Sequence, residues 1–180
     1  MRKYEDLYFL NGEDYEFYTP TGKIELYSTQ LEEMGFDPIP KYTKHEEPPS
    51  GYYRLLYGRA PMHTFGRTTN NRNLADLMDE NEIWINPKVA NEWGIKNRDY
   101  LILENQDGVK SNPIRAKVTE RIRHDCVYMV HGFGRTRKQL SRTYGKGAND
   151  AALMSRVKID PIMGGTGMRV NFVTFNLEGA

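Results

Sequence analysis

The pattern of hydrophobic and polar residues predicts a series of short strands rather than long helices. Runs of strand length are apolar or alternate between apolar and polar at Tyr15 to Tyr18, Tyr52 to Tyr57, Glu82 to Ile85, Tyr100 to Glu104, Ile114 to Val118, Cys126 to Val130 and Met168 to Phe175. The sequence Asn105-Gln106-Asp107-Gly108 supplies a turn, which predicts a β hairpin between the strands that flank it. Many short strands with few helices favour a closed β barrel over a doubly wound α/β sheet.

Capping residues predict two short helices between these strands. Asn86 is a suitable N-cap, Pro87 suits the first helical position, and Gly94 ends the segment. Asn149 can cap a single helical turn that runs to Met154.

The first fifty residues are expected to form an extension, in which a periodic segment runs from Lys23 to Met34. This segment leads into loop signals at Gly35, Pro38, Pro40, Pro48 and Pro49. We therefore expect residues 1–50 to link to preceding domains and residues 51–180 to form the compact body.

Composition limits the possible classes of protein. The chain has 180 residues, 38% hydrophobic and 12% aromatic, with a mean hydropathy of -0.72, which suits one soluble globular domain with an extension. The net charge of +1 gives no overall field that would attract nucleic acid or an acidic membrane. No apolar run is long enough to cross a bilayer, and the sequence shows no export signal, so we expect no direct membrane insertion.

The candidate chemistry lies in two loops that contain no acidic residue. One lies between Glu47 and Asp76 and the other between Asp125 and Asp150. Arginine, threonine, asparagine and the backbone amides of glycine can bind phosphates and the edges of heterocycles. Because each loop follows a predicted strand, we expect both to contact one anionic ligand. The alternatives are a solvated polar loop, a structural role for His131, and glycines that only turn the chain.

Other catalytic and metal-binding patterns find no support in the sequence. The four histidines are His45, His63, His124 and His131, and none has a second ligand at metal-binding spacing. The serines lie in no nucleophile-elbow pattern, and Cys126 is expected to be buried and inert. The run Gly164 to Gly167 has no phosphate-loop context and is expected to be a flexible turn.

A longer motif then resembles a known family. The stretch Thr19 to Ser28, TPTGKIELYS, is similar to the segment that precedes the last domain in the dimethyl-sulfoxide-reductase family of molybdenum oxidoreductases. The similarity continues through Asp37 to Pro40, Ile85 to Ala90 and later residues. His63 to Asn71 and His131 to Gly134 most resemble the thiosulfate and polysulfide reductase branch.

This resemblance implies a mainly β fold, a six-stranded double-psi β barrel with short helices, which closes over bis(molybdopterin guanine dinucleotide) carrying molybdenum or tungsten. The implied cofactor-binding residues form three groups: Arg59, His63, Thr64, Arg67, Thr68, Asn70 and Asn71; His131, Gly132, Phe133 and Gly134; and Asn149, Thr166, Met168 and Arg169. The metal-coordinating side chain and the iron-sulfur cysteines would lie in earlier domains, so no catalytic residue is expected in this chain.

The resemblance also implies what surrounds this domain. The partners would be the remaining domains of a catalytic subunit, an iron-sulfur electron-transfer subunit and a membrane-anchor subunit, and the parent enzyme would be periplasmic. From the residues alone, two other interpretations of the function of this chain stay open. One is a nucleic-acid-binding β-barrel module, since basic loops carry aromatic residues, and the other is a domain that only packs between others.

Overall fold

The computed structural model describes residues 17–177 and divides the chain into two compact units, Met1–His45 and Glu46–Ala180. In the first unit the helix α2, Thr29–Glu33, is capped by Ser28, whose hydroxyl accepts from the amide of Leu31 at 3.3 Å. The remainder of the periodic segment Lys23 to Met34 is not helical. Of the strand expected at Tyr15 to Tyr18, residues 15 and 16 lie outside the described residues, and Phe17 and Tyr18 are not in a strand.

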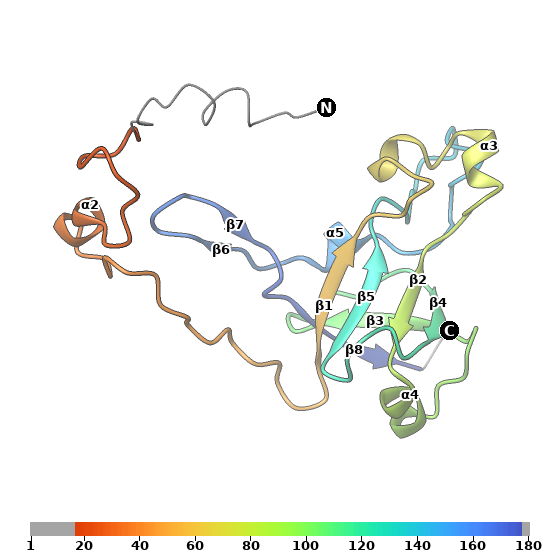
Figure 1. Cartoon of the computed structure of the whole chain (residues 1–180). Helices are drawn as coiled ribbons and strands as arrows, with labels where there is room; N and C mark the ends of the chain where they lie inside the picture. Colours follow the sequence, from red (N-terminus) through yellow and green to blue (C-terminus); the bar gives the residue numbers. More distant parts are fainter. Residues whose placement is uncertain (1–16, 178–180) are drawn as a thin grey trace. The chain divides into compact units, whose positions relative to one another are not determined.

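The second unit is built on a closed six-stranded barrel (Figure 1). Its strands are β1 Tyr53–Gly58, β2 Glu82–Ile85, β3 Tyr100–Asn105, β4 Ile114–Val118, β5 Cys126–Val130 and β8 Phe172–Asn176. Around the barrel the order is β1-β5-β2-β4-β3-β8, so neighbours in space are mostly distant in sequence. The predicted mainly β fold class is confirmed.

Strand direction determines where the loops emerge. Strands β1 and β5 are parallel, with Gly58 opposite Val130, while β2 is antiparallel to β5 and parallel to β4. The chain therefore leaves β1 and β5 at one end of the barrel and leaves β2 and β4 at the other.

Alternating side chains fill the barrel interior. Leu101 and Leu103 of β3 point inward with Ile114 and Ala116 of β4, and each is at most 1% exposed. This period of two is the one that the sequence predicted, because one face of each strand is buried.

The helix α4, Pro87–Trp93, confirms the predicted strand-to-helix step. The side chain of Asn86 accepts from the amide of Lys88 at 3.0 Å, and Gly94 ends the helix in the left-handed conformation. The predicted turn at Asn149 is also confirmed, as helix α5, Asp150–Leu153.

The end of the chain differs from the prediction. Residues 158–167 form a two-stranded hairpin, β6 Lys158–Ile159 with β7 Thr166–Gly167, and the final strand begins at Phe172 rather than Met168. Just before this strand, the side-chain amide of the fully buried Asn171 donates to the carbonyls of Met168 and Arg156 at 2.8 Å each, which ties the segment before Phe172 to the base of the hairpin.

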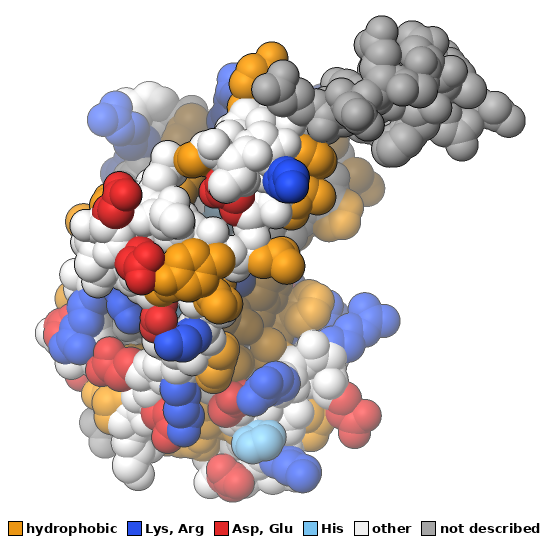
Figure 2. Space-filling model, turned by 60° about the vertical axis from the view of Figure 1, so that its left-hand side comes forward, with side chains coloured by type: hydrophobic (Ala, Val, Ile, Leu, Met, Phe, Trp, Pro, Cys, Tyr) orange, Lys and Arg blue, Asp and Glu red, His pale blue; other side chains and the backbone are white. Residues whose placement is uncertain are grey.

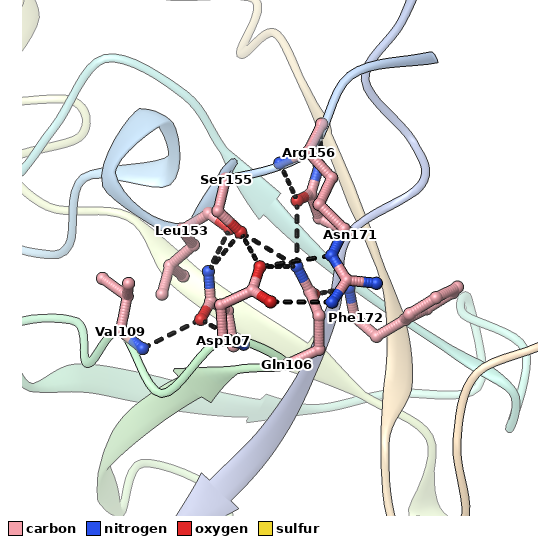
Figure 3. Close-up of polar contacts among 9 residues, drawn as sticks. Gln106, Asp107, Val109, Leu153, Ser155, Arg156, Asn171 and Phe172 are labelled. Carbon is pink, nitrogen blue, oxygen red and sulfur yellow. Dashed lines mark hydrogen bonds and ion pairs between the residues drawn. The ribbon is translucent and has the colours of Figure 1, made fainter.

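A polar network fixes the base of this hairpin to the barrel (Figure 3). Asp107, in the turn between β3 and β4, accepts from Arg156 at 2.7 Å and also from Ser155. The hydrogen bond from Arg156, followed by those from Ser155 and Gln106, holds the pKa of the Asp107 carboxyl well below its usual range. The hairpin is thereby tied to the β3–β4 turn.

On the face drawn in Figure 2, basic and acidic side chains are interspersed among hydrophobic ones, as the near-neutral charge implies. Within residues 17–177, no helix has the length and apolar character needed to cross a bilayer.

Candidate functional site: two loops at one end of the barrel

The two acid-free loops leave parallel neighbouring strands at the same end of the barrel. The first follows Gly58 and contains the single 3₁₀ turn η1, Phe65–Arg67, and the helix α3, Arg72–Ala75. The second follows Val130, which is opposite Gly58 in the register. In Figure 1 the arrows of β1 and β5 point toward the segment that carries α3.

The backbones of the two loops touch at a pair of glycines. A Cβ atom on Gly132, whose φ is +94°, would lie 2.5 Å from the amide nitrogen and 2.8 Å from the Cα of Gly66. Only glycine allows both this conformation and this approach. The contact joins the loops directly over the barrel end.

An aromatic stack joins the same loops through their side chains. The guanidinium of Arg59 lies 4.7 Å from the centre of the Phe65 ring, and that ring lies 4.5 Å from the His131 ring. Arg59 and His131 therefore contact one ring, and Arg67 lies two residues further along in η1. The structure thus gathers all three residues at one end of the barrel.

Hydrogen bonds of His63, Thr64 and Thr68 hold the first loop in its conformation. His63 is 6% exposed, and its two ring nitrogens lie 3.3 Å from the Thr68 hydroxyl and 2.7 Å from the Met78 carbonyl. The Thr68 hydroxyl also accepts from the amide of Thr64 at 2.8 Å. In this conformation the His63 ring fixes the loop rather than facing solvent.

The two asparagines predicted as site residues in the first loop, Asn70 and Asn71, also have partners within the protein. The side-chain oxygen of Asn70 accepts from the backbone amide of Arg142 in the second loop at 3.0 Å. Asn71 caps α3 by accepting from the amide of Leu74 at 3.3 Å. Asn70 thus adds a third link between the loops.

A salt bridge reinforces this junction. Lys146 lies 2.9 Å from Asp79, and its hydrogen bond lowers the pKa of that carboxyl. Both side chains are partly exposed, so the pair contributes little by itself.

Phe133 and Gly134 support the second loop. Phe133 is 1% exposed and packs edge-on against His63, with ring centres 5.6 Å apart. Gly134 has a φ of +69°, and a Cβ there would lie 2.7 Å from the carbonyl carbon of Ala148. The buried Asp150 accepts from the amide of Gly132 at 3.2 Å, which orients the turn after His131.

The third predicted group is only partly brought to this end. Asn149 caps α5, accepting from Ala151 at 3.1 Å, and Arg169 acts electrostatically on Tyr57, near the end of β1. Burial of Tyr57 raises the pKa of its hydroxyl, and the Arg169 charge opposes that effect. Thr166 and Met168 lie in and just after β7 of the projecting hairpin and are exposed.

Three buried polar atoms of the second loop have no hydrogen-bond partner among the described residues: Nε2 of His131, Nε of Arg135 and Oγ1 of Thr143. Buried donors are rarely left without a partner in a protein. Sequence reasoning proposed His131, counted Arg135 only among the basic residues of its loop, and missed Thr143 and Phe65. The local sequence pattern does not distinguish Arg135 from the nearby Arg137. The two residues differ in burial, since Arg135 is partly buried and Arg137 is exposed.

A cavity of about 410 Å³ lies beneath the first loop, on the outer face of the barrel. Trp84 and Tyr128 lie in its wall with ring centres 5.1 Å apart, and the Tyr128 hydroxyl donates to the carbonyl of Arg59 at 3.2 Å. This contact ties the start of the first loop to β5.

Among residues 17–177, neither a metal-binding cluster nor a reactive thiol is found. No group of three or more histidine, cysteine, aspartate or glutamate side chains in this part of the chain could hold a metal ion. Cys126 is buried, and burial raises the pKa of its thiol, so the reactive thiolate is disfavoured.

A closed barrel with two glycine-bearing, arginine-rich loops at one end has the chemistry suited to an anionic, nucleotide-like ligand. Residues 53–172 match the family model described as "Molydopterin dinucleotide binding domain". Since the match covers more than half of the chain, this chain belongs to the molybdopterin dinucleotide-binding domain family. It is therefore a domain that binds a molybdopterin dinucleotide cofactor.

Curated relatives agree with this assignment. The chain is 37% identical over 125 residues to the thiosulfate reductase molybdopterin-containing subunit PhsA of Salmonella typhimurium, covering 68% of this chain and 16% of that protein. It is 30% identical over 132 residues to the dimethyl sulfoxide reductase DmsA of Escherichia coli, covering 63% of this chain and 16% of that protein. The chain thus spans about one sixth of the length of each relative.

A solved structure shares the fold. Acetylene hydratase from Pelobacter acetylenicus superposes with a TM-score of 0.71 at 20% identity, over 93% of this chain and 25% of that one. This likeness supports the predicted barrel architecture.

Proposed function

We propose that the two joined loops bind a molybdopterin guanine dinucleotide, and that the chain is the carboxy-terminal domain of a thiosulfate- or polysulfide-reductase-like enzyme. The observation that carries this proposal is the direct contact of the loops at Gly66 and Gly132, above the parallel ends of β1 and β5. Arg59, Arg67 and His131 lie at the same end of the barrel, which supports the proposal that one extended ligand contacts all three.

The residues present fit a polyanionic dinucleotide. Arg59 and Arg67 are exposed guanidiniums that can bind phosphate with two parallel hydrogen bonds. The unpartnered donors of the second loop need an acceptor that the described residues do not provide. His63, Phe133, Asn70 and Asn71 would contribute by holding the loops in place, since their contacts lie within the protein.

Further contacts complete the proposed site. Thr64, Thr68, Gly132 and Gly134 would offer loop groups to the pterin and pyrophosphate, and Asn149 and Arg169 would approach from the start of α5 and the segment before β8. Thr166 and Met168 would join them only at a part of the ligand that extends toward the hairpin, where these exposed residues lie.

The cofactor would be the bis(dinucleotide) form with molybdenum or tungsten, and when bound it supplies the redox chemistry of the parent enzyme. This chain would bind and orient it and exclude water around it. The remaining domains of the catalytic subunit would supply the metal-coordinating side chain and an iron-sulfur cluster.

The wider setting follows from the name of one relative and from the resemblance. PhsA is a thiosulfate reductase subunit, which supports reduction of a sulfur oxyanion or polysulfide in anaerobic respiration. The partners would be an iron-sulfur electron-transfer subunit and a membrane-anchor subunit, with the enzyme in the periplasm. The family assignment favours dinucleotide over nucleic acid as the ligand of the basic loops.

Replacing Arg67 by Ala in the longer parent protein tests the proposal. We expect a lower content of molybdenum and of GMP released by acid hydrolysis, because a fixed phosphate ligand is lost. The matched control is Arg121→Ala, an exposed arginine just beyond β4 at the opposite end of the barrel, which should leave both unchanged. Unchanged cofactor content in Arg67→Ala would count against the assignment.

A further inference from the structure

The hairpin that projects from the barrel carries a concentration of exposed apolar side chains. We call residues 157–168, which include β6 and β7, the hairpin arm. Of the eleven large hydrophobic side chains that are exposed among residues 46–177, five lie on this arm: Val157 at 52%, Ile159 at 65%, Ile162 at 42%, Met163 at 85% and Met168 at 38%. In Figure 1 the arm extends away from the barrel strands. Apolar side chains gathered on one exposed element mark an interaction site.

The tip of the arm is a formed turn rather than an open loop. Oδ1 of Asp160 accepts from the amides of Ile162 at 3.0 Å and Met163 at 2.6 Å. The amide of Asp160 donates to the carbonyl of Gly165 at 2.8 Å, and the amide of Gly164 donates to the carbonyl of Asp160 at 3.0 Å. These bonds fix the backbone that carries Ile162 and Met163, so both apolar side chains are presented in a defined conformation.

The base of the arm is fixed to the barrel at both of its ends. Before β6, Arg156 donates to Asp107 at 2.7 Å, and its carbonyl accepts from Asn171 at 2.8 Å (Figure 3). After β7, the carbonyl of Arg169 accepts from the guanidinium of Arg54, in β1, at 2.6 Å. A partner that binds the tip therefore does not have to order the base, and such preorganisation lowers the entropic cost of a contact.

The small size of this apolar surface favours a partner in the same polypeptide over a second copy of this chain. A stable interface between separate chains involves about 20 to 30 residues a side. The arm offers five large apolar side chains. A contact within one polypeptide needs less surface, because the two parts are already joined and lose little translational freedom. The part matched by this chain is 16% of PhsA and 16% of DmsA, so most of such a polypeptide is available to cover the arm.

We propose that the tip of the hairpin arm seats in an apolar hollow formed by the preceding domains of the same polypeptide. This inference rests on the proposed function, which makes this chain the carboxy-terminal domain of a larger enzyme. It gives a docking role to Ile162 and Met163, which lie outside the residues proposed to bind the dinucleotide. The contact holds the barrel in a fixed position against the domains that complete the enzyme.

Photocross-linking in the longer parent protein tests which partner covers the tip. A benzoylphenylalanine placed at the position of Met163 reacts with the C–H groups that lie beside it on irradiation. We expect cross-links within one polypeptide, to peptides that precede residue 1 of this chain. Cross-links to a second copy, to another subunit or to no protein would overturn the proposal.

A charge at the tip tests the contact by a second route. Met163→Asp should leave the Tm of the 180-residue chain unchanged, because the side chain is 85% exposed there. In the parent protein it should increase the rate of native-state proteolysis between this domain and the preceding ones about tenfold or more, because an unpaired carboxylate is disfavoured in an apolar hollow. The matched control is Val109→Asp, at an exposed valine of the β3–β4 turn, which should change neither measurement.

The outcomes separate this inference from the proposed function. Equal proteolysis of the Met163→Asp and Val109→Asp parent proteins would overturn the docking role, and so would an equal loss of Tm in the chain and the parent. The cofactor content of the Arg67→Ala parent protein tests the dinucleotide site independently. Cross-links to the preceding domains with full cofactor content in Arg67→Ala would overturn the dinucleotide site alone.

Discussion

The side chain of Asn81 forms two hydrogen bonds with the backbone of Ala148, in the way that a paired strand would. Its Oδ1 accepts from the Ala148 amide and its Nδ2 donates to the Ala148 carbonyl, each at 2.9 Å. The same Nδ2 donates to the carbonyl of Val130 at 2.6 Å, at the end of β5. Asn81, which is fully buried, thereby closes the second loop onto the barrel.

Replacing Asn81 by Ala should lower the free energy of unfolding by about 3 kcal/mol, because it leaves buried backbone groups without partners. Urea denaturation measures the change. The control Asn73→Ala, at an exposed position of α3, should stay within about 0.5 kcal/mol of the unaltered chain. Similar stabilities for the two variants would contradict the role given to Asn81.

Gly132→Ala should destabilise the joined loops by about 3 kcal/mol, since strain from the positive φ adds to overlap with Gly66. Gly108→Ala provides the comparison, because Gly108 has a φ of +80° and open space around it, so only the conformational cost of about 1 kcal/mol applies. Denaturant unfolding of both variants isolates the contribution of the contact. Equal losses would mean that the loops do not press together at Gly132.

His63→Ala should loosen the first loop by removing the bond to Met78 and the packing against Phe133. We expect a loss of about 2 kcal/mol and faster hydrogen exchange at the amides of residues 64 to 78. His124→Ala, at an exposed histidine, serves as the control. Unchanged exchange in this segment would show that His63 does not support the loop.

The hairpin base should depend on pH through Asp107. Its pKa is depressed in the folded chain, chiefly by the hydrogen bond from Arg156, so its stabilising contribution is present above the unfolded pKa of about 3.9. That contribution is lost as the pH falls through the folded pKa. Asp107→Asn should therefore lower the Tm at pH 7 and have a smaller effect at pH 3.

Thermal unfolding at both pH values, with Glu120→Gln at an exposed position as the control, checks this expectation. If Asp107→Asn lowers the Tm equally at pH 7 and pH 3, the ionised carboxylate does not hold the hairpin.

The sequence by itself determined the positions of the barrel strands, apart from the start of β8, together with the capped helices α4 and α5 and the two loops in which the site would lie. The step from Glu82 through the Asn86 cap to Gly94 was predictable because each signal acts within a few residues. The acid-free loops were equally visible, since charge patterning needs no knowledge of contacts. The late start of the last strand could not be predicted from the sequence. The segment before that strand is held by a hydrogen bond from the side chain of Asn171 to the carbonyl of Arg156, which is far from it in sequence.

Only the tertiary structure decided which loop residues are buried with partners inside the protein and which are exposed or left without a partner among the described residues. The sequence pattern treated Arg135 and Arg137 alike, and it treated His63 as it treated His131. The barrel order places β5 beside β1, and this long-range pairing brings Gly132 onto Gly66, buries His63 and leaves Nε of Arg135 without a hydrogen-bond partner among residues 17–177. Such pairing depends on the packing of the whole barrel, which no local pattern encodes.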